Sequence, residues 1–290
     1  MILQIIVNTL TIGSLYALIA TGFNVLYCTT RFFNLAYGTF LAVGGYAFVL
    51  LVNRLHGYTV MLAVLASLIT GLIGWSTNKM VFKKLRDNNS SALVMMVASL
   101  GLMIVLQSLL SIFFGNQFKM LSVDYALPLF KFFSTTITTP QILIIVMLLI
   151  TVIALYVLLQ RTKFGIQVRA VGDDVQLAQA TGIDTNKIIS RIFFLSAVIA
   201  GFTGILIGLD TGIEPLMGFS WLIKGVIAAI IGTIGYWYGG ILGAFLLAFI
   251  EQIAAWQFSG EWKDAVSYAS LIIFLVILPN GIFESRRSGR

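Results

Sequence analysis

The chain has 290 residues, of which 59% are hydrophobic and 10% charged, and it carries a formal net charge of +7. Charged residues make up about a quarter of ordinary soluble domains. The composition therefore excludes a soluble globular protein and predicts one membrane-embedded unit over residues 1–290. The positive charge lies in short stretches between apolar runs, which is typical of membrane topology and argues against nucleic-acid binding.

Apolar runs predict an all-α bundle that crosses the membrane eight or nine times. A helix needs roughly 20 apolar residues to span the hydrocarbon core. The first run has no basic stretch before it and is longer than the core of a signal peptide, so we expect it to be retained. The expected segments are 2–27, 35–53, 58–79, 91–114, 140–159, 190–210, 219–235, 239–257 and 265–280. The seventh is the shortest and contains Gly225, Gly232 and Gly235, so it either spans fully or is re-entrant.

The distribution of Lys and Arg predicts the orientation. With the N-terminus outside and the C-terminus in the cytoplasm, 13 of the 18 basic residues fall on the inner side, as the positive-inside rule requires. The five outer residues are then Arg54, Lys119, Lys131, Lys224 and Lys263. The inner ones are Arg31, Lys79, Lys83, Lys84, Arg86, Arg161, Lys163, Arg169, Lys187, Arg191, Arg286, Arg287 and Arg290.

The first two spans carry small and amide residues that allow two interpretations. Gly13, Ala17, Ala20 and Asn24 recur at helical three-to-four spacing, and Gly44 and Gly45 follow in the second span. Such residues let helices pack closely, and in a membrane they also border cavities. The segment is thus either a packing face or the lining of a translocation pathway. The pathway candidates here are Gly22, Asn24, Asn34, Tyr37 and Gly38.

Glu251 is a further pathway candidate, because an ionisable residue inside a span is costly and is retained mainly for function. A structural role for Glu251 is the alternative.

Motifs of enzymes and nucleotide-binding chains are missing from the sequence. No H-E-x-x-H, G-x-S-x-G or Gly-Lys sequence occurs, so neither an enzyme nor a nucleotide-binding chain is expected. Cys28 and His56 are the only residues of their kinds, which leaves no disulfide and no metal site. A stand-alone secondary carrier or channel that depends on Glu251 or Asp210 is a rival hypothesis.

The segment 160–190 is the most polar part of the chain and is predicted to be a cytoplasmic loop. Asp173 or Asp174 is a good N-cap and Gly182 a good helix stop, so a helix of about two turns is expected between them. So short a helix is stable only when it is packed. It is either an ordinary connector or an element that enters a groove on a partner protein.

Four motifs in order point to a known family: Gly13-x-x-Tyr16-Ala17-Leu18-Ile19-Ala20-x-Gly22; Asn34-x-Ala36-x-Gly38 with Gly44 and Tyr46; residues 161–183; and Glu261-x-Lys263-Asp264-x-Val266-Ser267 with Pro279-x-Gly281-Ile282. Together, over nearly the whole length, they resemble the permease subunits of ATP-binding cassette (ABC) importers for branched-chain amino acids. The resemblance is to the H-type subunit of the leucine/isoleucine/valine system. It implies a multi-pass protein of the cell inner membrane that works by alternating access.

The polar loop is similar to a degenerate EAA loop of ABC permeases, although the Glu and final Pro of that motif are missing. The resemblance implies that this loop docks on a separate ATPase. The implied coupling residues are Asp173, Asp174, Gln176, Leu177, Ala178 and Gly182.

The resemblance also implies the partners: two ATP-binding subunits, a second similar permease, an extracytoplasmic binding protein and the surrounding lipid. It implies no cofactor. Tyr37 stands where relatives usually have His, which leaves the substrate open. Branched-chain or other small neutral amino acids are expected, with urea or short amides as the alternative.

Overall fold

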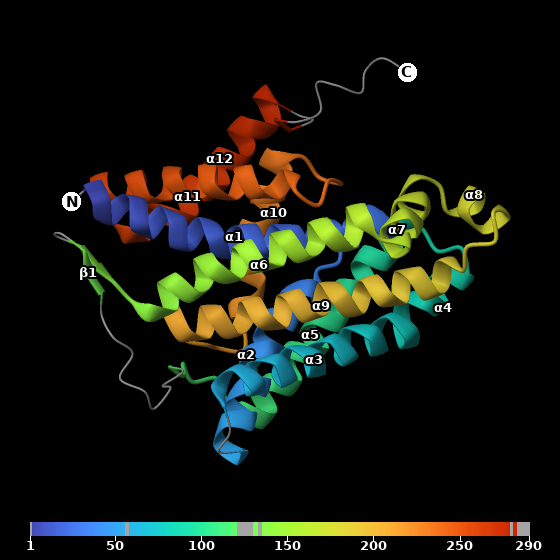
Figure 1. The fold of residues 1–290 in the computed structure, drawn as a ribbon, viewed down its shortest axis with the longest axis horizontal. Helices are drawn as coiled ribbons and strands as arrows, with labels where there is room; N and C mark the ends of the chain where they lie inside the picture. The colour runs from blue at the N-terminus through green and yellow to red at the C-terminus, as the bar shows by residue number, and fades with distance from the viewer. Residues whose placement is uncertain (1, 56–57, 121–129, 133–134, 279–280, 283–290) are drawn as a thin grey trace.

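The computed structural model describes residues 2–55, 58–120, 130–132, 135–278 and 281–282, and Figure 1 traces the chain. The N-terminal half contains α1 (Ile2–Thr30), α2 (Ala36–Arg54), α3 (Thr59–Thr77), the π-helical turn η1 (Asn78–Phe82), α4 (Lys83–Asp87) and α5 (Ala92–Phe114). A two-stranded antiparallel pair, β1 (Phe130–Phe132) and β2 (Thr135–Ile137), follows. The rest comprises α6 (Thr139–Arg161), α7 (Lys163–Asp173), α8 (Val175–Ala180), α9 (Thr185–Asp210), α10 (Met217–Gly232), α11 (Gly239–Gln257), the 3₁₀ turn η2 (Gly260–Trp262) and α12 (Lys263–Ile277).

The prediction of an all-α polytopic bundle is confirmed. Within the described ranges, seven helices are long and apolar enough to cross a membrane: α1, α2, the continuous run from α3 through α4, α5, α6, α9 and α11. The seventh predicted span is indeed short, because α10 has only 16 residues. The last, α12, has 15. Regular helices are the expected solution, since each satisfies its own backbone hydrogen bonds in a medium without water.

The long helices α1, α6 and α9 run side by side along the long axis, and α3 packs on α9 (Figure 1). Glycines allow the closest approaches. A Cβ at Gly204 on α9 would lie 1.8 Å from the carbonyl oxygen of Leu41 on α2. This distance is too short for any side chain, so only glycine fits at this position. Small residues are enriched where membrane helices associate, since backbone contact there replaces the hydrophobic force that acts in water.

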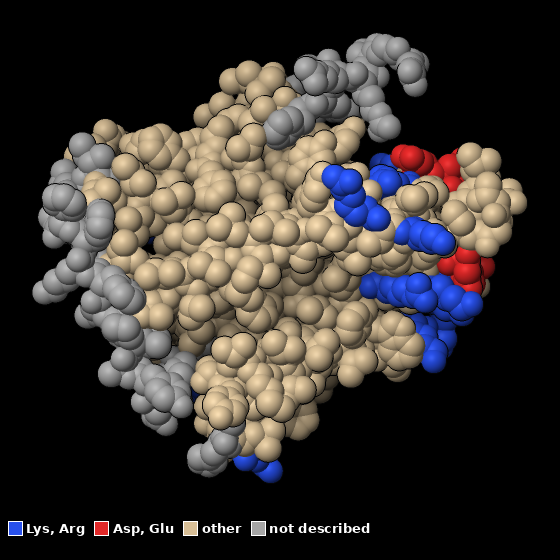
Figure 2. Space-filling view, in the orientation of Figure 1, with Lys and Arg blue, Asp and Glu red and all other residues tan. Residues whose placement is uncertain are grey.

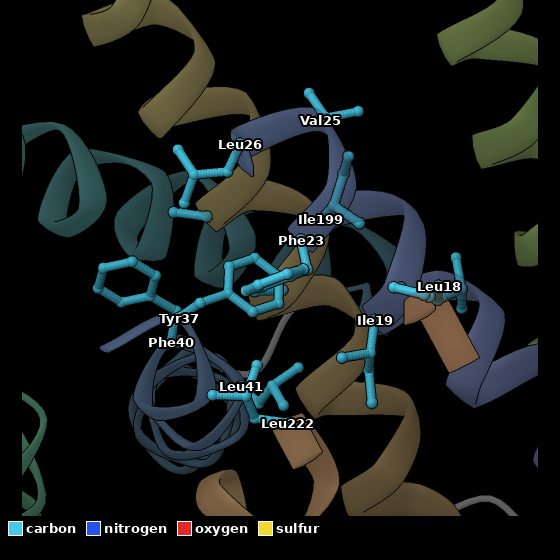
Figure 3. Close-up of a cluster of buried hydrophobic side chains, with 14 of the residues drawn as sticks. Leu18, Ile19, Phe23, Val25, Leu26, Tyr37, Phe40, Leu41, Ile199 and Leu222 are labelled. Carbon is cyan, nitrogen blue, oxygen red and sulfur yellow. The ribbon is translucent and has the colours of Figure 1, made fainter. Parts of the chain in front are cut away.

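A buried apolar cluster joins α1, α2, α9 and α10 beside this crossing (Figure 3). Its members include Leu18, Ile19, Phe23, Val25, Leu26, Tyr37, Phe40, Leu41, Ile199 and Leu222. This cluster fixes how the first two spans meet, and those spans carry most of the predicted pathway residues.

Basic side chains gather at the end of the bundle where α4, α7 and α8 lie (Figures 1 and 2). The described parts of the chain at that end are Arg31 just after α1, the turn η1, α4, the C-terminal end of α6, the whole of α7 and the start of α9. They carry ten of the basic residues that the sequence assigned to the inner side. The other three, Arg286, Arg287 and Arg290, lie outside the described residues.

Candidate functional site

Gly22 and Tyr37 are in direct contact at the junction of α1 and α2. The Tyr37 side chain is fully buried, and a Cβ placed on Gly22 would lie 2.1 Å from its hydroxyl oxygen. Phe23 packs edge-on to the same ring, with 6.1 Å between ring centroids (Figure 3). Among the described residues the Tyr37 hydroxyl has no hydrogen-bond partner. Gly22 therefore provides the space that the Tyr37 ring occupies.

The two asparagines lie in different surroundings. The side-chain amide of Asn24 donates to the carbonyl of Tyr236 at 3.0 Å, which ties α1 to the turn between α10 and α11. Asn34, just before α2, accepts a hydrogen bond from the backbone amide of Ala36 at 3.1 Å. Both are buried, and each retains one polar atom, Asn24 Oδ1 and Asn34 Nδ2, without a partner among the described residues.

Gly38 lies where α2 meets α10. A Cβ there would be 2.5 Å from the carbonyl oxygen of Gly218, so two glycines bring the backbones together. In this structure Gly38 packs against α10. The predicted group around α1 and α2 is thus brought together by contacts between helices, and Glu251 is not part of it.

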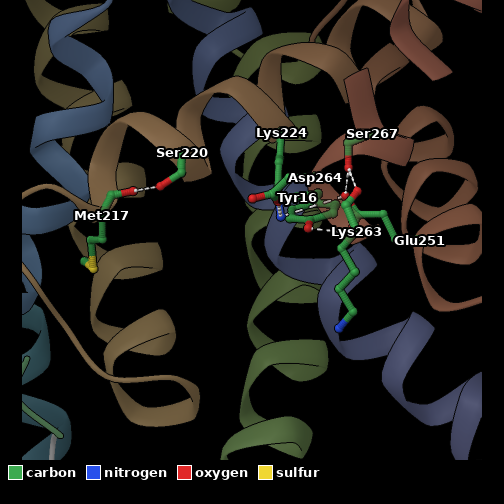
Figure 4. A network of polar contacts seen from close by, with 8 residues as sticks. All are labelled: Tyr16, Met217, Ser220, Lys224, Glu251, Lys263, Asp264 and Ser267. Atoms are coloured by element: carbon green, nitrogen blue, oxygen red, sulfur yellow. Dashed lines mark hydrogen bonds and ion pairs between the residues drawn. The ribbon is translucent and has the colours of Figure 1, made fainter. Parts of the chain in front are cut away.

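Glu251 instead belongs to a polar network that joins α1, α10, α11 and α12 (Figure 4). Its side chain is fully buried. The Tyr16 hydroxyl donates to one carboxylate oxygen at 2.7 Å, and the Ser267 hydroxyl donates to the other. The Lys224 ammonium lies 4.0 Å from Glu251 and 2.7 Å from Asp264. One cation thus faces two carboxylates.

The network reaches from the middle of α1 to the first turns of α12. Tyr16 is the central residue of α1, and Gly225, which follows Lys224, packs against Ile19. The sequence-based count of charges placed Lys224 on the outer side, and the structure places it within α10. Its position inside an apolar run is a signal by which the sequence could have singled it out.

The Glu251 network is not a metal site. Over the described ranges, no group of three or more His, Cys, Asp or Glu side chains lies close enough together to hold a metal ion. The charges of the network are instead compensated by Lys224 and by hydroxyl donors.

The polar segment between α6 and α9 folds as α7 and α8 at the basic end. The predicted short helix is present as the six residues of α8. The Asp174 carboxylate caps α8 by accepting hydrogen bonds from the backbone amides of Gln176 and Leu177 at 2.8 and 2.9 Å. Gly182 follows with a φ of +84°, and its amide bonds the carbonyl of Gln179. The caps therefore act as the sequence predicted.

The two faces of α8 differ. Ala178 is only 3% exposed and packs against its own chain, whereas Leu177 is 65% exposed. A buried alanine seats the helix on α7 and α9, and an exposed leucine is available to another protein. Nearby, Asp184 caps α9, and hydrogen bonds from Lys187 hold the pKa of its carboxyl below the usual value.

A direct connection links α7 to α1. The Arg31 guanidinium, just after α1, donates to the carbonyl of Gly172 at 3.1 Å. A Cβ on Gly172 would lie 2.7 Å from the carbonyl of Cys28, so α7 touches the α1 backbone. A cavity of about 380 Å³ opens beside this contact, lined partly by Arg169 and Tyr236. The end of α1 and the end of α7 are therefore in direct contact.

Comparison with known proteins identifies the family. Residues 5–275 match the model described as branched-chain amino acid transport system / permease component. The chain belongs to this family. The match covers nearly the whole sequence, so the resemblance that the motifs suggested is confirmed. No solved structure matches the permease.

Three curated relatives agree. The permease is 32% identical to the high-affinity branched-chain amino acid transport system permease protein LivH of Escherichia coli, over 97% of this chain and 94% of the relative. It is 31% identical to BraD of Pseudomonas aeruginosa, a protein of the same description, over 97% and 95%. A probable LivH of Methanocaldococcus jannaschii is 28% identical over 96% and 91%. These relatives are transport permeases and not enzymes, and this permease is a multi-pass protein of the cell membrane.

Proposed function

We propose that the permease is the membrane-spanning subunit of an ATP-driven importer for branched-chain amino acids in the cell inner membrane. Its partners are two ATP-binding subunits, a second similar permease and an extracytoplasmic binding protein. The match of residues 5–275 to transport permeases supports the class. The absence of a Gly-Lys sequence supports separate ATP-binding chains, because the phosphate-binding loop requires one.

The orientation places the N-terminus outside and the α7–α8 end in the cytoplasm. The basic end of the bundle supports this choice, since inner loops carry an excess of Lys and Arg (Figure 2). In this orientation residues 160–190 form a cytoplasmic coupling loop of the single domain 1–290. The end that carries α8 then faces the compartment that contains ATP.

The coupling helix is α8, and its exposed Leu177 is the observation that carries the proposal. An apolar side chain 65% exposed, beside Gln176 on a helix too short to be stable alone, suits insertion into a groove on an ATP-binding subunit. Asp174 and Gly182 flank this helix, and Asp173 ends α7 before it, so all three are expected to act by holding the shape of the loop.

Alternating access follows from the contacts between α8 and the bundle. Closure of the ATP-binding subunits moves α8. A single residue, Asp174, separates α8 from α7, so α7 moves with it. Because α7 is joined to α1 through Arg31 and Gly172, α1 moves with it. The Gly22, Asn24 and Tyr37 region and the Glu251 network are both attached to α1, so both are expected to change when the bundle rocks.

The pathway candidates have unequal roles in this proposal. Asn24, Asn34 and Tyr37 each hold a buried polar atom without a partner among the described residues, which suits transient hydrogen bonds to a passing substrate. Gly22 and Gly38 allow the close packing that must loosen for passage. Glu251 orders the ionic network.

The test is leucine uptake by liposomes that contain the permease, its partner subunits and loaded binding protein. Leu177→Asp should abolish uptake and release the ATP-binding subunits, while the permease still inserts. Asn88→Asp, which adds the same charge in the exposed turn after α4, should transport normally. Full transport by Leu177→Asp refutes the coupling role. Uptake by the permease alone, lost on changing Glu251, would instead select a stand-alone carrier.

Accessibility tests the orientation. In a Cys28→Ser background, Leu177→Cys leaves α8 with the only cysteine. A membrane-impermeant maleimide should label it in inside-out vesicles and leave it unlabelled in intact cells. Labelling in intact cells would refute the orientation, and the importer assignment with it.

A further inference from the structure

The ion pair of Lys224 and Asp264 differs from the rest of the network in its exposure. Glu251 is enclosed, with hydroxyls of Tyr16 and Ser267 on its two oxygens. The Lys224 side chain is 18% exposed, and that of Asp264 is 66% exposed. The network therefore has an inner, fully bonded carboxylate and an outer, accessible pair.

Asp264 lies in the first turn of α12, and Lys224 connects it to the enclosed Glu251, which the Tyr16 hydroxyl binds from the middle of α1. Ionisable groups at membrane depth face a bundle interior, a water-filled cavity or another chain. The face of α12 that carries Asp264 also carries Tyr268, one helical turn further and 44% exposed. This face therefore offers a cation, an anion and an aromatic surface together.

We propose that Lys224 and Asp264 form a subsite for the charged groups of a zwitterionic amino acid, in a pathway bordered by α10 and α12. This proposal rests on the proposed function and assigns it a substrate site. The substrate carboxylate binds the Lys224 ammonium, and the substrate ammonium binds the Asp264 carboxylate. Tyr268 and the ring of Trp221, which packs 5.8 Å from Tyr16 between centroids, adjoin the apolar side chain.

Charge balance favours this exchange. A zwitterion carries no net charge. When it enters, the Lys224–Asp264 pair separates and each of the two side chains pairs with one charged group of the substrate, so no buried charge is left without a partner. Glu251 stays 4.0 Å behind Lys224 and keeps the ammonium in place when Asp264 turns to the substrate. Binding requires the 2.7 Å Lys224–Asp264 contact to break, and this cost lowers the affinity for the substrate. A low affinity suits a transport site, because the substrate must leave it again.

Neutral variants in the complete transport complex test the site. Asp264→Asn and Lys224→Met should each lower the rate of leucine uptake by about 10-fold or more, because each removes one charge that the zwitterion needs. The ATP-binding subunits should still co-purify. The matched controls are Glu261→Gln and Lys263→Met, which change neighbouring charges that make no ion pair in the described structure, and both should transport within about twofold of wild type.

The exchange variant Lys224→Asp with Asp264→Lys separates this site from a structural ion pair. It restores the pair but reverses its direction. A substrate site predicts a complex that assembles and does not transport, whereas recovered uptake would mean that the pair only holds the helices. Uptake by Asp264→Asn within about twofold of wild type would also overturn the site. If the wild-type complex takes up no neutral amino acid, the proposed function fails, and this site fails with it.

Discussion

Replacing Gly22 by alanine should destabilise the permease, and replacing Tyr37 by phenylalanine in the same chain should restore its stability. The added Cβ would lie 2.1 Å from the Tyr37 hydroxyl oxygen, about 1.3 Å inside the 3.4 Å at which ordinary contact begins. The next atoms, Ile199 Cγ2 and Tyr37 Cζ, are at 3.1 and 3.2 Å and need only small shifts. One oxygen atom therefore accounts for the clash.

The magnitude follows from the packing. Overpacking a buried site costs about 1–3 kcal/mol, and the better helix propensity of alanine offsets up to about 1 kcal/mol. Tyr37→Phe alone should be neutral or stabilising, because a buried hydroxyl without a partner costs about 1–3 kcal/mol. The double variant should lie near wild type, which gives a coupling energy of about 1–2 kcal/mol between the two sites.

Thermal unfolding of the purified complex, followed by tryptophan fluorescence, measures all four corners of the cycle. Gly101→Ala is the matched control, since no atom lies within 4 Å of the Cβ it adds on α5, and its midpoint should not fall. Equal midpoints for Gly22→Ala and wild type, or no recovery in the double variant, would refute the assigned contact. Leucine uptake by Tyr37→Phe then decides the role of the hydroxyl: a pathway role requires a loss.

Three further predictions concern α8, its connection to α1 and the ionic network. Asp174→Ala removes the α8 N-cap, worth about 1 kcal/mol, so amide exchange in α8 should rise about fivefold in hydrogen-exchange mass spectrometry; unchanged exchange contradicts the cap. Gly172→Val pushes α7 away from the Cys28 carbonyl and should lower leucine uptake at normal membrane levels, an effect absent if α7 transmits nothing. Glu251→Leu removes the acceptor of the Tyr16 and Ser267 hydroxyls, while Lys224 keeps Asp264, and should cost about 1–3 kcal/mol. Glu251→Gln retains an acceptor, so its yield of monodisperse protein should be higher, and equal yields would count against the network.

The hydropathy of the sequence was enough to predict the membrane helices. The length of an apolar run can be read locally, and a segment that crosses the bilayer must be helical to satisfy its own backbone hydrogen bonds. The expected segments therefore agree with the observed helices, including the short α10. The α8 caps were equally predictable, since Asp174 bonds amides two and three residues away and Gly182 adopts a positive φ by itself. The family was recognisable from motifs for the same reason, as their order is written in the chain.

Tertiary structure alone decided which helices meet. Tyr16 and Glu251 are 235 residues apart, and nothing local indicates that a phenol and a carboxylate will share a hydrogen bond. Lys224 pairs with Asp264 because α10 and α12 pack together, and Ala178 is buried because α8 packs on α7 and α9. Between membrane helices no hydrophobic gradient selects the facing surfaces, so backbone fit at glycines and the pairing of buried charges select them. Those choices exist only in the assembled bundle.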